Sequence, residues 1–252
     1  MQHVVEKTPL GQQVKLLIKN DQWIILCAVC VIGTIGYVIR GSVAAYYAKY
    51  YLGGSATLLS QFLSVGVAAA ILAMVASTWI TKRFCKVQLF RWSQVAVGLL
   101  SVILYFAVKP GAVIPAFILY FLLSFVVDLH APIFWSAIAE AVDYGEVKTG
   151  TRVSGLAWGG ISFCQKAGMA LAGAVVGMLL TYYNYVPDQT QSAFTLRGIA
   201  LMLSVIPGFF HFVMGLLMFK YRITDRFYKR MQETRSLNPG LTADHVPEAP
   251  LA

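Results

Sequence analysis

Lys166 is a cation in the middle of a long apolar stretch, so something must neutralise or hydrate its charge there. The stretch runs from about Val153 to Leu180. At a rise of about 1.5 Å per residue, Lys166 lies roughly 20 Å from Arg152 at one end. A hydrocarbon core is about 30 Å thick, so the ammonium cannot reach water along its own side chain. An ionisable group there costs at least ~2.5–3.5 kcal/mol and usually marks a pathway or a site. We therefore expect Lys166 to face a polar cavity.

The residues around Lys166 have the chemistry of a sugar site. Spacings of three and four residues place four of them on one helix face: Gly155, Trp158, Ser162 and Lys166. An indole stacks on the C–H side of a pyranose, whereas a hydroxyl and an ammonium hydrogen-bond its edge. Trp158 has a second interpretation as an interfacial anchor, because it lies a turn or two from the end of the stretch.

Two other long apolar runs, Gln22–Ala45 and Ala112–Ala139, carry further polar groups. Asp128 lies about as deep as Lys166 and is the only acid that we place in mid-membrane, so it is the natural intrachain partner of that lysine. His130 could relay protons, bind a substrate or simply pack, and Trp135 extends the candidate site. Arg40, toward the outer end of the first run, could contact the substrate or extend its side chain to the membrane surface.

The composition predicts an integral membrane protein. Hydrophobic residues make up 58% of 252 positions and charged residues only 12%, more apolar surface than a soluble domain of this length can bury. Six apolar runs are long enough to span a bilayer, and none alternates like a strand. We predict an all-α membrane protein with six transmembrane helices. The predicted spans are Gln22–Ala45, Ala56–Ile80, Val87–Val108, Ala112–Ala139, Val153–Leu180 and Gly198–Phe219.

Lys and Arg gather on one side of the predicted membrane. They occupy the segments before the first span, between the second and third, between the fourth and fifth, and after the sixth. The other side carries only Lys49, Lys109 and Arg197. The positive-inside rule then places both termini in the cytoplasm.

Three regions follow from this pattern. Residues 1–21 form a cytoplasmic segment whose amphipathic stretch, Leu10 to Lys19, lies on the membrane interface with Thr8 as its N-cap. Residues 22–220 form the six-helix bundle. Residues 221–252 form a cytoplasmic tail that is basic and, from Ser236 onward, disordered by its Pro and Gly content.

Proline and glycine interrupt the predicted spans. Pro132 and Pro207 each free a backbone carbonyl and allow a kink, and His211 could bond the carbonyl that Pro207 frees. On the fifth span, glycines at four-residue spacing predict close helix packing, and such surfaces also let one helix rock past another. The pairs are Gly155/Gly159 and Gly173/Gly177.

The connection between the fourth and fifth spans is the most specific motif. Its alternating acids and bases could lock neighbouring helix ends with a charge network that opens and closes, or could form a solvated, capped turn. The candidate residues of this cytoplasmic gate are Asp143, Tyr144, Gly145, Glu146, Lys148 and Arg152.

This motif, D-Y-G-E-x-K-T-G-x-R from Asp143 to Arg152, is followed fourteen residues later by Lys166. In this it resembles the glycoside–pentoside–hexuronide sugar:cation symporters of the major facilitator superfamily, and the similarity extends across all six spans. The resemblance implies half of a twelve-helix major facilitator fold, the C-terminal half. It also implies that Lys166 faces the cation site, that Ser162 is near the sugar, and that Arg152 belongs to the cytoplasmic gate. The family's cation-binding acids lie in the N-terminal half.

We therefore predict secondary transport of a sugar or glycoside, coupled to Na⁺ or H⁺, in a bacterial inner membrane. Such transport needs an N-terminal half or a second copy of the chain. The alternative is a non-transporting relic or interaction partner from a truncated or split carrier gene. We predict no enzyme, no cofactor beyond the coupling ion, no metal site and no nucleic-acid partner. Cys27 and Cys30 lie inside an apolar helix, where they pack as small apolar groups.

Overall fold

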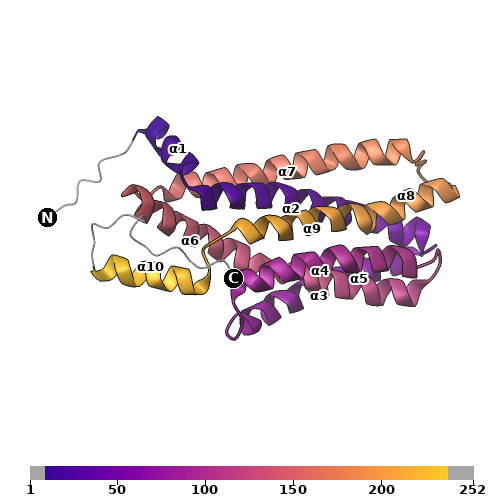
Figure 1. Cartoon of the computed structure of the whole chain (residues 1–252). Coiled ribbons are helices and arrows are strands. Elements are labelled where there is room, and N and C mark those ends of the chain that lie inside the picture. Colours follow the sequence, from indigo (N-terminus) through magenta and orange to yellow (C-terminus); the bar gives the residue numbers. More distant parts are fainter. Residues whose placement is uncertain (1–8, 238–252) are drawn as a thin grey trace.

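A computed structural model describes residues 9–237 as a bundle of helices (Figure 1). Thr8, the predicted N-cap, and the residues after Leu237 lie outside this described part. Within residues 9–237 every regular element is helical, and six segments are long and apolar enough to cross a membrane, which confirms the predicted fold class. These segments are Asp21–Tyr51, Ala56–Ile80, Lys86–Ala107, Val113–Thr149, Ser154–Tyr182 and Ala193–Thr234.

Three of the segments are single helices and three are composite. The single helices are α3 (Ala56–Ile80), α4 (Lys86–Ala107) and α7 (Ser154–Tyr182). The first segment joins α2 (Asp21–Tyr46) to a short π-helix, η1 (Tyr47–Tyr51), and the fourth joins α5 (Val113–Asp128) to α6 (Ala131–Thr149). The sixth comprises α8 (Ala193–Leu203), α9 (Val205–Leu217), the 3₁₀ turn η2 (Met218–Lys220) and α10 (Asp225–Leu237).

Several helices extend beyond the predicted spans, because a helix need not end where its apolar stretch ends. α6 continues past the predicted end at Ala139 to Thr149, so most of the gate motif is helical rather than a loop. It ends at Gly150, whose φ of 72° caps the helix in the left-handed region. The predicted basic tail begins with a helix, α10, which packs on α6, and the part predicted to be disordered, from Ser236, lies almost entirely outside the described residues.

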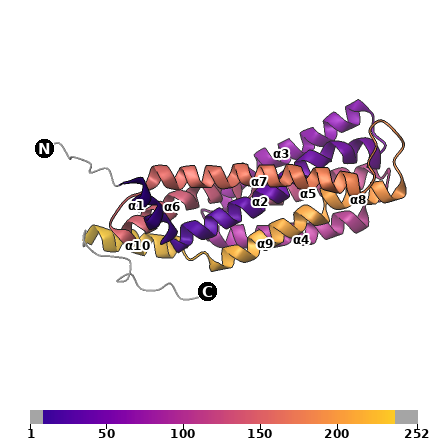
Figure 2. The ribbon, with the colours of Figure 1, turned by 90° about the horizontal axis from the view of Figure 1, so that it is seen from above.

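The helices lie side by side in the order α7, α2, α9, α4, α5 and α3 (Figure 1, Figure 2). The first helix, α1 (Leu10–Ile18), and α10 lie at the same end of the bundle. α7 and α3, the two helices at the edges of this row, are the least covered by the rest of the bundle. Of the most apolar stretch of each helix, 17% is buried in α7 and 22% in α3, against 39% in the segment that contains α2. α3 and α7 therefore each have an open face, one that no other helix within residues 9–237 covers.

The contact between α2 and α7 depends on two glycines. A Cβ added at Gly160 would lie 2.5 Å from the Trp23 ring, and one at Gly168 would lie 2.9 Å from the Thr34 side chain and 3.0 Å from the Val31 carbonyl. The two helices run in the same direction, so these contacts form one continuous row. The glycines predicted to pack closely have open space around their Cα atoms instead: Gly155, Gly159, Gly173 and Gly177.

We expect Gly168→Ala to destabilise the bundle, because the added methyl meets a backbone oxygen that cannot rotate away. Overpacking of this kind costs about 1–3 kcal/mol. Gly173→Ala, on the same helix but in open space, is the matched control and should gain the helix propensity of alanine. Thermal unfolding in detergent should give a lower midpoint for Gly168→Ala than for Gly173→Ala. Equal midpoints would mean that this contact does not hold α7 on α2.

Candidate functional site

Two adjoining hollows lie beside α2 and together form what we call the central hollow. The larger, of about 440 Å³, lies between α2, α3 and α5, and the smaller, of about 240 Å³, lies between α2, α6 and α7. Tyr37, Met74 and Asp128 line both. The polar residues of the larger part are Tyr37, Arg40, Tyr120, Ser124 and Asp128, and those of the smaller part include Thr34, His130, Trp135 and Gln165.

Asp128 is the last residue of α5 and is only 6% exposed. Of the ion pairs within residues 9–237, none joins Asp128 to Lys166, so the predicted intrachain pair is not formed. Its charged neighbour is Arg40 of α2, which lines the larger part as well. A carboxylate so placed can accept hydrogen bonds from a ligand in the hollow.

Arg40 is held in the protein interior and does not extend to the membrane surface. It is 5% exposed, and its Nε donates to the Leu203 carbonyl at 3.2 Å while Nη2 donates to the Ser101 hydroxyl at 3.2 Å. The Leu203 carbonyl is free because Pro207, one turn later, has no N–H to donate. Nη1 has no hydrogen-bond partner. The kink in the sixth span thus supplies the acceptor that fixes Arg40.

His211, which is buried, and His130, which is half-buried, have different partners. His211 does not bond the carbonyl freed by Pro207; its Nδ1 lies 2.9 Å from Gln94 Oε1. His130 lines the smaller part of the hollow, bonds the Val127 carbonyl through Nδ1 and packs edge-on against Phe90. His130 therefore presents a partly tethered ring to the hollow.

The predicted stripe on α7 lies outside the central hollow. Lys166 and Ser162 are exposed on the open face of α7 and line neither part of it. Trp158 is 38% exposed and stacks on Trp135, with ring centroids 6.1 Å apart and planes 6° apart. Gln165 is the polar residue of α7 that lines the hollow. Of the sequence candidates, the structure thus brings together Arg40, Asp128, His130 and Trp135, and it leaves Lys166 and Ser162 apart.

Five polar lining residues were missed by sequence reasoning: Thr34, Tyr37, Tyr120, Ser124 and Gln165. A signal was present for three of them. Tyr37 precedes Arg40 by three residues, and Tyr120 and Ser124 precede Asp128 by two turns and one turn, so each shares a helix face with a charge that was noticed. Gln165 gives no such signal, because it lies one residue from the more conspicuous Lys166.

The gate residues form a charge network at the end of the bundle that holds α1 and α10. Arg152 contacts Asp143 at 2.6 Å and Glu146 at 2.7 Å. The hydrogen bonds with Glu146 and Asp143 raise the pKa of Arg152 above its ordinary value. The Tyr228 hydroxyl of α10 donates to Asp143 at 2.5 Å.

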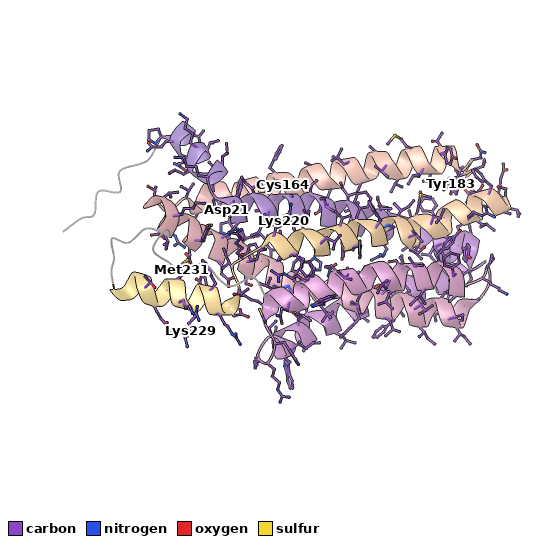
Figure 3. The ribbon with its side chains drawn as sticks, viewed as in Figure 1. Asp21, Cys164, Tyr183, Lys220, Lys229 and Met231 are labelled. Carbon is purple, nitrogen blue, oxygen red and sulfur yellow. The ribbon has the colours of Figure 1, made fainter. Side chains whose placement is uncertain are left out.

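A second set of contacts joins α6 to the start of α2. Lys148 pairs with Asp21 at 2.8 Å, and the Tyr144 hydroxyl donates to the same carboxylate at 3.2 Å. Gly145 allows α6 to approach the start of α2 closely, since a Cβ at this position would lie 2.5 Å from Nδ2 of Asn20, the N-cap of α2. Figure 3 shows Asp21 at this end of the bundle, and Met231 on the side of α10 that faces α6. The motif therefore ties α6 to α2 and to α10.

At the opposite end, an ion pair fastens the connection between α7 and α8. Lys49 of η1 pairs with Asp188 at 2.6 Å, and this hydrogen bond lowers the pKa of the Asp188 carboxyl. The Tyr50 hydroxyl accepts from the Asp188 backbone at 3.1 Å. Among the described residues, no group of three or more His, Cys, Asp or Glu side chains could hold a metal ion.

Comparison with known proteins places this architecture in a family. Residues 2–225 match the family described as MFS/sugar transport protein. A putative glycoside/cation symporter, YagG of Escherichia coli K12, is 31% identical over 245 residues, covering 96% of this chain and 53% of that protein. The isoprimeverose transporter of Lactiplantibacillus pentosus is 31% identical over 218 residues, covering 84% of this chain and 44% of that protein.

A third relative, a putative sulfoquinovose importer of Escherichia coli K12, is 30% identical over 216 residues and is covered over 45% of its length. The chain thus spans about half the length of the relatives it matches. Six spans in half the length agree with half of a twelve-helix fold, and the names of the relatives confirm the resemblance to sugar:cation symporters. The chain belongs to the MFS/sugar transport protein family and carries six of the spans of a major facilitator fold.

Proposed function

We propose that this chain is one half of a secondary transporter that moves a sugar or glycoside together with Na⁺ or H⁺ across a bacterial inner membrane. The observation that carries the proposal is the central hollow. Its walls hold a buried acid, Asp128, and a buried base, Arg40, among tyrosine and tryptophan rings. Sugars combine hydroxyl donors, hydroxyl acceptors and C–H faces, and this wall offers a partner for each.

Five lining residues have a role in this proposal. Asp128 accepts hydrogen bonds from sugar hydroxyls, and the tyrosine hydroxyls of Tyr37 and Tyr120 donate or accept at the edge of the ring. Trp135, held by its stack on Trp158, offers an indole face to the C–H side of the sugar. Gln165 supplies both a donor and an acceptor from α7.

Lys166 is assigned to the joint surface with a second half. An exposed ammonium deep in a span is too costly to leave in lipid. Gly155 and Gly159, also on α7, leave open space beside it for another helix to approach. A six-helix N-terminal half would cover α3 and α7 and enclose the hollow, with its acids near Lys166 to hold the cation. A second copy of this chain is the competing arrangement.

The break at Leu129–His130 gives the transporter a hinge. α6 carries His130 and Trp135 at the hollow and the gate residues at its other end, so a tilt of α6 changes both together. Moving one charge across 100 mV releases ~2.3 kcal/mol, roughly a fortyfold concentration ratio, so one cation per sugar suffices for uptake. The second candidate, a non-transporting relic or interaction partner, is favoured only by the open faces of α3 and α7.

Reporter fusions test the proposed orientation. With both termini in the cytoplasm, fusions at Gly53, Lys109 and Pro187 should all report the external side, because these residues lie in the connections at the end opposite α1 and α10. A fusion after Thr81 should report the cytoplasm and serves as the control. A cytoplasmic signal at any of the first three positions would contradict this topology.

Transport should require a second half and Asp128. We expect the chain alone to insert but to give no cation-driven sugar accumulation, because a midplane cation site needs more carboxylates than Asp128, the one acid that this chain offers at that depth. Co-expression with a family N-terminal half should restore uptake, and Asp128→Asn should then reduce it at least tenfold, about 1.4 kcal/mol. Asp188→Asn, on an exposed acid outside the hollow, is the control. Sugar uptake by the purified chain alone that Asp128→Asn abolishes would instead favour a homodimer.

Thiol labelling tests the position of Lys166. In a cysteine-free background, Lys166→Cys should react with a small hydrophilic reagent once an N-terminal half is present, because the residue then borders a water-filled pathway. Phe209→Cys, at an exposed apolar residue of α9, should stay protected as a lipid-facing control. Protection of both cysteines, with and without the second half and with and without sugar, would show that Lys166 does not face a pathway.

A further inference from the structure

A third cavity, of about 440 Å³, lies at the end of the bundle opposite α1 and α10. We call it the outer cavity. Its walls come from η1, the end of α4 with the turn after it, and α8. It shares no lining residue with the central hollow. The residues that matter for its chemistry are Tyr51, Tyr105, Phe106, Lys109, Leu196 and Arg197.

The outer cavity concentrates positive charge that nothing nearby balances. In the connections at this end, Asp188 is the one acid among the described residues, and it is already paired with Lys49 at 2.6 Å. Lys109 and Arg197 are exposed, line the same cavity, and take part in none of the ion pairs found within residues 9–237. External cations are rare under the positive-inside rule, so two of them facing one cavity call for an anionic ligand.

The remaining walls of the outer cavity are apolar and aromatic. Phe106 is 76% exposed, Leu196 is partly exposed, and Tyr105 offers both a ring and a hydroxyl. The cavity lies where the apolar helix α4 ends at Ala107, which is the depth at which phosphate headgroups meet the acyl chains. A small soluble anion would match the two cations and leave these walls uncovered.

We propose that the outer cavity binds an anionic phospholipid of the leaflet at this end. The planar guanidinium of Arg197 holds two phosphate oxygens, and the ammonium of Lys109 acts as a point charge on a third. Tyr105 contacts the glycerol part, and an acyl chain runs along Phe106 and Leu196. Such a lipid fastens the start of α8 to the end of α4, away from the central hollow, so it acts on the scaffold rather than competing with a sugar. The proposal uses the orientation proposed above but not the transport function, so the lipid-binding test and the transport tests can fail separately.

Lipid retention by the purified chain tests this site. The chain in detergent is titrated with phosphatidylglycerol or with phosphatidylcholine of the same acyl chains, and bound lipid is counted by native mass spectrometry. We expect phosphatidylglycerol to bind at least about tenfold more tightly, and Lys109→Gln/Arg197→Gln to remove that preference. Both side chains are exposed and unpaired, so this double variant should fold. Lys109→Arg/Arg197→Lys keeps the charge and should keep the preference.

Two further arms identify the ligand. Lys82→Gln/Arg83→Gln removes the same charge from exposed residues at the other end of the bundle and should leave the preference unchanged. Inorganic phosphate, added in millimolar excess, should not displace the lipid. Displacement by phosphate would overturn the lipid assignment in favour of a soluble anion. Equal binding of the two lipids, or an unchanged preference in Lys109→Gln/Arg197→Gln, would overturn the site itself.

Discussion

The central hollow depends on one constraint: inside a bilayer, every backbone carbonyl that a helix break frees must find a donor within the protein. Two spans are broken, at Leu129–His130 and at Ser204. At the first break the Val127 carbonyl accepts from Gln94 of α4 and the Leu129 carbonyl accepts from Ser77 of α3 at 2.8 Å. At the second, the Leu203 carbonyl accepts from Arg40. The breaks therefore bind neighbouring helices together.

The two helix breaks also determine where Arg40 and Asp128 place their charges in the membrane. Arg40 stays inside because Leu203 and Ser101 accept two of its N–H groups, which lowers the cost of burying a guanidinium. Asp128 is brought to the hollow that Arg40 lines because α5 ends there, one turn before Pro132. Two opposite charges line one hollow, each still able to bond a ligand, as a direct consequence of two prolines placed in two different spans.

The fold could be predicted from the sequence, whereas the site could be predicted only in part. Six apolar runs specify six spans by length alone, and this prediction is confirmed. Helix ends such as Thr149 could not be placed, because hydropathy reports the membrane boundary and α6 continues beyond it. Arg40 and Asp128 were recognised as costly, but their partners depend on how α2, α5 and α9 pack. The cavity predicted for Lys166 stays a prediction, because this side chain is exposed on α7 and what covers it cannot be inferred from the residues around it.

The open face of α7 follows from how α7 is attached. Its contact with α2 is made by glycines at one face, so the helix lies close to the bundle while its other residues, Lys166 among them, remain uncovered. In a soluble protein, further apolar side chains would have to pack on such a face. In a bilayer, lipid can cover the apolar residues but not the ammonium, which needs a charged or hydrated neighbour. Lys166 therefore specifies the chemistry of the surface that covers α7. That surface must bring carboxylates or water to mid-membrane depth.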